Sequence, residues 1–245
     1  MFTLNHFIWL GIVVIYIILL LSIQKRKNIE FNKILTFLFI VCLLSEIIKI
    51  FSNLVETSEG GTVLNPADLP FHLCSIQIFF VFALKFLIKK EQTKQNLISF
   101  MAPTMLVGGI IALFIPTVGV EFTKPQVYQY FIFHGTIIFF AIYALKENIV
   151  TYTWKCFIRN LSYLGALALL VTWINSILSV TNPKVNFFYL CRPPMENLPI
   201  LNLNNGWLAY FLTVVSIALL FMFMFHFIMI KINKKITTKQ HINTL

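Results

Sequence analysis

Cysteine and histidine side chains occur in two short motifs that could do chemistry. His72-Leu73-Cys74 opens one apolar run, and His134 lies inside another. A cysteine thiolate is a nucleophile, and an imidazole within hydrogen-bonding reach can take its proton and return it to a leaving group. Residues two apart on a helix point about 200° apart. His134 is therefore the better base for Cys74, while His72 could orient a substrate or pair with Glu46.

Other polar residues interrupt the apolar runs. Glu46 and Lys49 are one helical turn apart on the same face, and Gln77 and Asn175 lie in two further runs. Polar and ionisable groups inside membrane helices are energetically costly, so they are candidates for function.

A structural interpretation of the same residues stays open. Glu46 and Lys49 can neutralise each other, Gln77 can bond to a neighbouring backbone, and carbonyls can satisfy the histidines. Cys74 could instead form a disulfide with Cys191. The remaining chemistry-bearing residues of the apolar runs are interpreted as packing or interfacial residues: Cys42, Cys156 and His226.

The segments that must position these residues are membrane spans. The chain of 245 residues is 58% hydrophobic and only 11% charged, whereas a soluble domain carries about a quarter charged residues. No segment has the pattern of a strand. We predict an all-α, polytopic bundle forming a single integral membrane domain over 1–245, with seven spans at about 7–23, 34–52, 70–88, 98–115, 128–145, 160–180 and 206–230.

The basic residues predict the orientation of the bundle. Fifteen of the 19 lie after spans one, three and five and in the C-terminal tail. The positive-inside rule makes these connections cytoplasmic and the N-terminus external. Six spans would break this alternation and are the main alternative. The net charge of +10 thus reflects topology, and we expect no nucleic acid partner, no metal centre and no cofactor.

With this orientation, the polar groups lie at a similar depth near the external face. Glu46, Lys49, His72 and Cys74 fall in the outer parts of their spans. His134 lies about six residues below the boundary, or roughly 9 Å at 1.5 Å per residue. If these helices face one another, they form an outward-facing polar pocket.

Three motifs, in this order, resemble the YwaF-like, or transmembrane protein 164, family of integral membrane proteins. They are His72-Leu73-Cys74, Phe133-His134-Gly135 and the segment from Asn186 through Tyr189 to Pro194, which is followed by Gly206-Trp207. The family includes an animal phospholipid acyltransferase that depends on a cysteine and a histidine. The resemblance implies Cys74 as acyl acceptor, His134 or His72 as base, a membrane lipid as partner, and a bacterial plasma membrane as location.

The sequence leaves two functions open. One is an acyltransferase with catalytic Cys74, His134 and His72, whose pocket binds a lipid headgroup through the residues Glu46, Lys49, Gln77, Asn175, Asn186 and Tyr189. The other is a non-enzymatic receptor or small-solute transporter that uses the same pocket. A translocation path would need polar residues in the inner halves of the spans, and these look almost entirely apolar.

Overall fold

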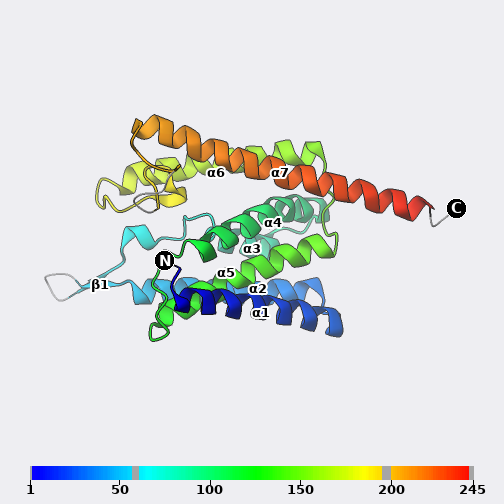
Figure 1. The fold of residues 1–245 in the computed structure, drawn as a ribbon, viewed down its shortest axis with the longest axis horizontal. Helices are drawn as coiled ribbons and strands as arrows, with labels where there is room; N and C mark the ends of the chain where they lie inside the picture. Colours follow the sequence, from blue (N-terminus) through cyan, green and yellow to red (C-terminus); the bar gives the residue numbers. More distant parts are fainter. Residues whose placement is uncertain (1, 57–60, 195–199, 243–245) are drawn as a thin grey trace.

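The chain forms a bundle of roughly antiparallel helices (Figure 1). The computed structural model describes residues 2–56, 61–194 and 200–242. Within these ranges the α-helices are α1 (Leu4–Lys27), α2 (Phe31–Ser52), α3 (Gln77–Phe82), α4 (Glu91–Phe114), α5 (Pro125–Lys146), α6 (Trp154–Leu178) and α7 (Gly206–Ile242). Six of them are long and apolar enough to cross a membrane. The predicted all-α membrane bundle is confirmed.

Helix α5 occupies the centre of the bundle and packs against α1, α2 and α4. Its buried residues run from Val127 to Ala144 and lie on all sides of the helix, as expected of a helix that is apolar all round. Pro125 stands in its first turn, where the missing N–H has no helical partner to lose. The central helix is therefore packed on all sides, and His134, which it carries, is buried within the bundle.

Helices α6 and α7 form a pair whose outer surface carries large apolar side chains. The most exposed include Leu169, Trp173, Leu208 and Leu220. A soluble protein rarely shows such a surface, whereas a bundle surrounded by lipid requires it.

The predicted third span differs in detail from the structure. The segment His72–Ile76 is a series of turns, and helix α3 begins only at Gln77 and continues as a π-helix over Ala83–Leu87. Helices α2 and α4 nevertheless run in the same direction (Figure 1), so the chain between them must return through the bundle. The segment 70–87 makes this return, partly without regular helix.

The connections contain a little structure of their own. Strand β1 (Val55–Glu56) pairs antiparallel with β2 (Thr62–Val63), so the expectation of no strand was wrong for this one connection. Single 3₁₀ turns occupy Pro66–Asp68 and Phe187–Tyr189. The second of these turns contacts the cysteine motif described next.

Candidate functional site

Cys74 lies in a turn and not in a regular helix. The amide of Ile76 donates to the carbonyl of His72 at 2.8 Å, and the amide of Gln77 donates to the carbonyl of Cys74 at 3.3 Å. The regular helix that the sequence predicted for His72 and Cys74 is therefore replaced by hydrogen-bonded turns. The turn places this motif directly before the first residue of α3, between α4 and the segment 186–190.

Three different elements surround the thiol of Cys74. A Cβ atom added at Gly108 of α4 would lie 3.2 Å from Sγ of Cys74. Helix α4 can approach the sulfur this closely because Gly108 has no side chain. The thiol also interacts electrostatically with the phenol groups of Tyr130, on α5, and Tyr189. Burial and the nearby thiol raise the pKa of Tyr189 to about 12, which keeps this phenol protonated.

Lys49 is the charged centre of the site. Its Nζ atom lies 2.5 Å from Oε2 of Glu46 and donates to Oγ of Ser75 at 3.3 Å. The same ammonium group interacts electrostatically with the imidazoles of His72 and His134. The ammonium of Lys49 thus connects α2 to the turn that carries Cys74. That these residues share one polar pocket with His134 stays a prediction.

The hydrogen bond of His134 fixes its tautomer. Its Nδ1 lies 2.7 Å from the carbonyl oxygen of Tyr130, and a carbonyl can only accept, so Nδ1 carries the proton. The lone pair of the neutral ring is then on Nε2, the atom that can act as a base.

The segment 186–190 lies against the cysteine motif. The ring of His72 contacts those of Phe187 and Tyr189, with centroids 5.2 and 5.3 Å apart. Phe188 and Tyr189 have positive φ angles of 57° and 54°, which non-glycine residues adopt only under tertiary constraint. Two of the three motifs that carry the family resemblance therefore touch each other.

Two asparagines supply this constraint. Asn175 donates to the carbonyl of Phe187 at 3.0 Å and accepts from its amide at 2.9 Å. Asn186 donates to the carbonyl of Arg192 and accepts from the amides of Cys191 and Arg192. Both side chains are almost fully buried. Their amides are engaged in holding the segment, and direct contact of either one with a substrate stays a prediction.

The beginning of α7 closes the same segment. Trp207 donates through Nε1 to the carbonyl of Leu190 at 3.1 Å, and the hydroxyl of Tyr210 donates to the carbonyl of Tyr189 at 2.5 Å. Trp207 and Tyr210 of α7 therefore hold the backbone of Leu190 and Tyr189 in place.

Gln77 lies beneath the cysteine turn and bonds to α4. Its Nε2 donates to the carbonyl of Leu73 at 3.1 Å and to the hydroxyl of Thr104 at 3.0 Å. The bond to the neighbouring backbone that the sequence suggested is confirmed. Its Oε1 is buried without a hydrogen-bond partner.

The four cysteines are all unpaired in the structure. The alternative of a disulfide between Cys74 and Cys191 is therefore not formed here. Cys191 lies in an exposed position next to Arg192, and partial burial raises the pKa of its thiol.

A second polar cluster, which the sequence did not reveal, lies at the other end of the bundle. Asn160 on α6 donates to the carbonyl of Ser99 at 2.8 Å and to Nε2 of His226 at 3.0 Å. Arg159 donates to the hydroxyl of Ser99 at 3.0 Å and to Sγ of Cys156 at 3.3 Å. These polar residues are isolated in three separate apolar runs of the sequence and meet only in the fold.

Comparison with known proteins agrees with the resemblance of the motifs. No protein of curated function and no solved structure matches the chain. The profile of the TMEM164 family matches residues 1–227, which include the whole site around Cys74. The protein is a multi-pass membrane protein, and it belongs to the TMEM164 family.

Proposed function

We propose that the protein is an acyltransferase of a bacterial plasma membrane that moves a fatty acyl group between phospholipids through a thioester on Cys74. The observation that carries the proposal is the approach of α4, α5 and the segment 186–190 to the Cys74 thiol. Lys49, which interacts electrostatically with His72 and His134, bonds to Ser75, the chain neighbour of Cys74. The family resemblance supplies the chemical class. Cysteine and histidine are the residue types that transfer of an acyl group through a thioester requires.

The proposed reaction has two steps. The Cys74 thiol gives its proton to Nε2 of His134, and the thiolate attacks the ester carbonyl of a phospholipid. The C–O bond breaks, the thioester forms, and the leaving hydroxyl of the lysophospholipid takes the proton from the imidazolium. In the second step an acceptor hydroxyl gives its proton to His134 and attacks the thioester carbonyl. The C–S bond breaks, the new ester forms, and the leaving thiolate of Cys74 takes the proton from the imidazolium.

The charged residues are assigned to the lipid headgroup. The ammonium of Lys49 is an attractive partner for a phosphate diester, with His72 and Tyr189 beside it. Glu46 holds this ammonium in place at 2.5 Å. The tyrosine hydroxyl, which stays protonated, is a hydrogen-bond donor for the same headgroup.

An apolar groove between α2 and α5 is suited to an acyl chain. It has a volume of about 490 Å³, and the residues that line it include Leu44, Ile48, Tyr128, Ile132 and Phe133. Ser45 and Gln129 bond to each other at its wall at 2.5 Å. Phe133 and Ser45 are the chain neighbours of His134 and Glu46, so the groove and the proposed site share the helices α2 and α5.

The decisive experiment looks for the thioester itself. Wild-type protein in proteoliposomes is incubated with a phospholipid that carries an alkyne-tagged acyl chain. We expect a hydroxylamine-sensitive label on the protein, together with transfer to added lysophospholipid. Cys74→Ala should remove both, while Cys191→Ala, which removes an exposed cysteine, should keep both. Full transfer activity in Cys74→Ser would exclude the thioester step.

His134→Asn separates the two uses of that side chain. Asparagine keeps a donor for the Tyr130 carbonyl but has no basic nitrogen in place of Nε2. We expect a loss of about 100-fold or more in transfer rate, as for other acid–base residues, with an unchanged thermal unfolding midpoint. A rate within twofold of the wild type would assign the base to another residue.

A small-solute transporter is the second candidate, and one observation favours it. The buried cluster of Ser99, Asn160 and His226 provides polar groups at the end of the bundle opposite the Cys74 site. A transporter should expose a Ser75→Cys thiol to water-soluble reagents from both sides of the membrane in turn. An acyltransferase with a fixed pocket should expose it from one side only.

A further inference from the structure

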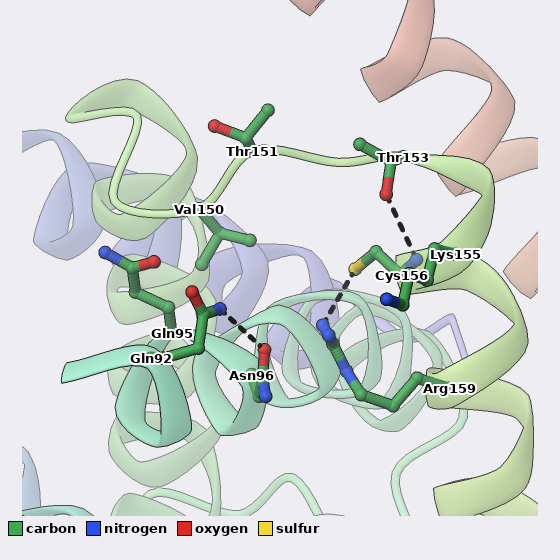
Figure 2. Close-up of a pocket in the computed structure, with 9 residues that line it drawn as sticks. All are labelled: Gln92, Gln95, Asn96, Val150, Thr151, Thr153, Lys155, Cys156 and Arg159. Carbon is green, nitrogen blue, oxygen red and sulfur yellow. Dashed lines mark hydrogen bonds between the residues drawn. The ribbon is translucent and has the colours of Figure 1, made fainter. Parts of the chain in front are cut away.

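We propose that a second pocket, at the end of the bundle where α4 and α6 begin, binds a phosphate group. Its volume is about 300 Å³, and its lining includes Gln92, Gln95 and Asn96 from α4 and Thr151, Lys155 and Arg159 from the following linker and α6 (Figure 2). Asn96 is 12 residues from Gly108 on α4, or roughly 18 Å along the helix. The pocket is thus separate from the Cys74 site, and the inference does not depend on the proposed acyl transfer.

The charge of the pocket favours an anion. Lys155 and Arg159 contribute two positive charges, and no acidic residue is part of the lining. Among the described residues, Arg159 has no carboxylate partner, and its Nε is buried without a hydrogen-bond partner. An arginine kept from carboxylates in a partly buried position is suited to a bidentate oxyanion such as phosphate.

The guanidinium group is held in position before any ligand binds. It donates to Ser99 and Cys156, and Ser99 is fixed in turn by Asn160, which accepts from its hydroxyl at 3.1 Å. Figure 2 shows the guanidinium pointing from α6 toward α4 and the side chain of Asn96. A preorganised donor loses less conformational entropy when the anion binds.

The first turn of α6 adds to the attraction. Thr153 caps the helix by accepting from the amide of Cys156 at 3.2 Å, and the first turn contains no acidic residue. The positive end of the helix dipole is therefore not neutralised by the chain itself. Lys155 lies in this first turn with an exposed side chain, so an anion there meets the dipole, the ammonium and the guanidinium together.

The other polar groups complete the shell that a phosphate needs. Hydroxyls and amides from Thr151, Gln92 and Gln95 can donate to the oxygens that the cations do not reach. A phosphate group at this position can come from a soluble molecule or from a membrane phospholipid. Both present the same oxyanion to the same residues, so the test must separate the two sources.

The test measures binding and not acyl transfer, so it stays independent of the proposed function. Full-length protein in detergent is titrated with inorganic phosphate at constant ionic strength, and the thermal unfolding midpoint is recorded. In parallel, native mass spectrometry counts the phospholipid molecules that remain after delipidation. The variants are Arg159→Gln and Lys155→Gln, with Arg26→Gln as a control, because Arg26 is an exposed arginine of α1 outside the pocket.

Two results support the proposal and identify the source. Phosphate that raises the midpoint of wild type and Arg26→Gln, with affinity reduced roughly tenfold in Arg159→Gln, indicates a soluble phosphate ligand. A retained phospholipid that Arg159→Gln loses and Arg26→Gln keeps indicates a lipid headgroup. If Arg159→Gln does not fold, the exposed Lys155→Gln gives the comparison. No phosphate shift and no difference in retained lipid between wild type and the pocket variants overturns the proposal.

Discussion

At the scale of single residues, the ion pair between Glu46 and Lys49 decides the charge of the proposed active site. The two side chains are only 9% and 17% exposed, so water screens their interaction weakly. Removing one partner of such a pair leaves an uncompensated charge and costs about 3 kcal/mol or more. We therefore expect Lys49→Met to lower the thermal unfolding midpoint of the protein in detergent.

A double variant separates the cost of the unpaired Glu46 charge from the loss of the aliphatic part of the Lys49 side chain. Glu46→Gln combined with Lys49→Met removes both charges, so most of the lost stability should return. A double variant as unstable as Lys49→Met would mean that the ion pair is not the cause. Acyl transfer should stay low in both variants, because both lack the ammonium that is assigned to the headgroup.

Gly108 provides a test of the space around the thiol. A methyl group there would lie 3.2 Å from Sγ of Cys74 and 3.8 Å from Cδ2 of Leu73. We expect Gly108→Ala to slow alkylation of Cys74 by a small thiosulfonate severalfold and to slow acyl transfer, with the fold intact. Gly165→Ala is the matched control, because nothing lies within 4 Å of its added atom. Equal alkylation rates in both variants would contradict the close approach of α4.

Some of these contacts could be predicted from the residues and some could not. The spacing of Glu46 and Lys49 predicted their pairing, because residues three apart share a helix face. The partners of Asn175 and Asn186 are backbone groups of an irregular segment. Such partners have no sequence signature, so the holding role of the two asparagines could not be predicted.

At the scale of elements, the packing of α4 against the central α5 depends on a second glycine. An added Cβ at Gly109 would lie 2.6 Å from Cγ1 of Ile138 and 3.4 Å from the carbonyl oxygen of His134. Overpacking of this kind typically costs about 1–3 kcal/mol. Gly109→Ala should therefore lower the thermal midpoint, whereas Gly165→Ala should leave it unchanged or raise it through its better helix propensity. Equal midpoints would show that the two helices can separate freely.

The segment 186–190 depends on α6 in a way that hydrogen exchange can measure. Asn175→Ala removes both hydrogen bonds to the backbone of Phe187, leaving a buried donor and acceptor at a cost of about 1–3 kcal/mol. We expect faster amide exchange at Phe187, detected by mass spectrometry. Ser176→Ala, at an exposed neighbouring position, should not change it. Unchanged protection in Asn175→Ala would mean that α7 alone holds the segment.

The elements themselves were predictable to different degrees. The six long helices follow from apolar runs that only a membrane can accommodate. The late start of α3 at Gln77 could not be predicted, because Phe71, Leu73 and Ile76 continue the apolar run on its N-terminal side. Its turns are stabilised by tertiary contacts with Gly108 and with the rings of Phe187 and Tyr189.

At the scale of the whole molecule, the two ends of the bundle differ in chemistry. One end carries the Cys74 site and the connections with few basic residues, and the other carries the phosphate pocket and most of the lysines and arginines. The charge bias was visible in the sequence. The cluster of Ser99, Asn160 and His226 was not, because each residue is a single polar position in a different helix.

The orientation of the bundle remains a prediction that one native residue can test. Cys191 is exposed and lies between α6 and α7, on the end that the positive-inside rule makes external. In intact cells that carry the protein with Cys74→Ala, a membrane-impermeant maleimide should label Cys191, and the further change Cys191→Ser should abolish this labelling. Because partial burial raises the pKa of this thiol, its thiolate fraction and labelling rate should keep rising at pH values where an ordinary thiol has already reached its plateau. Lys89→Cys in the Cys191→Ser background should react only after permeabilisation. The reverse pattern would place the Cys74 site at the cytoplasmic face and turn the phosphate pocket outward.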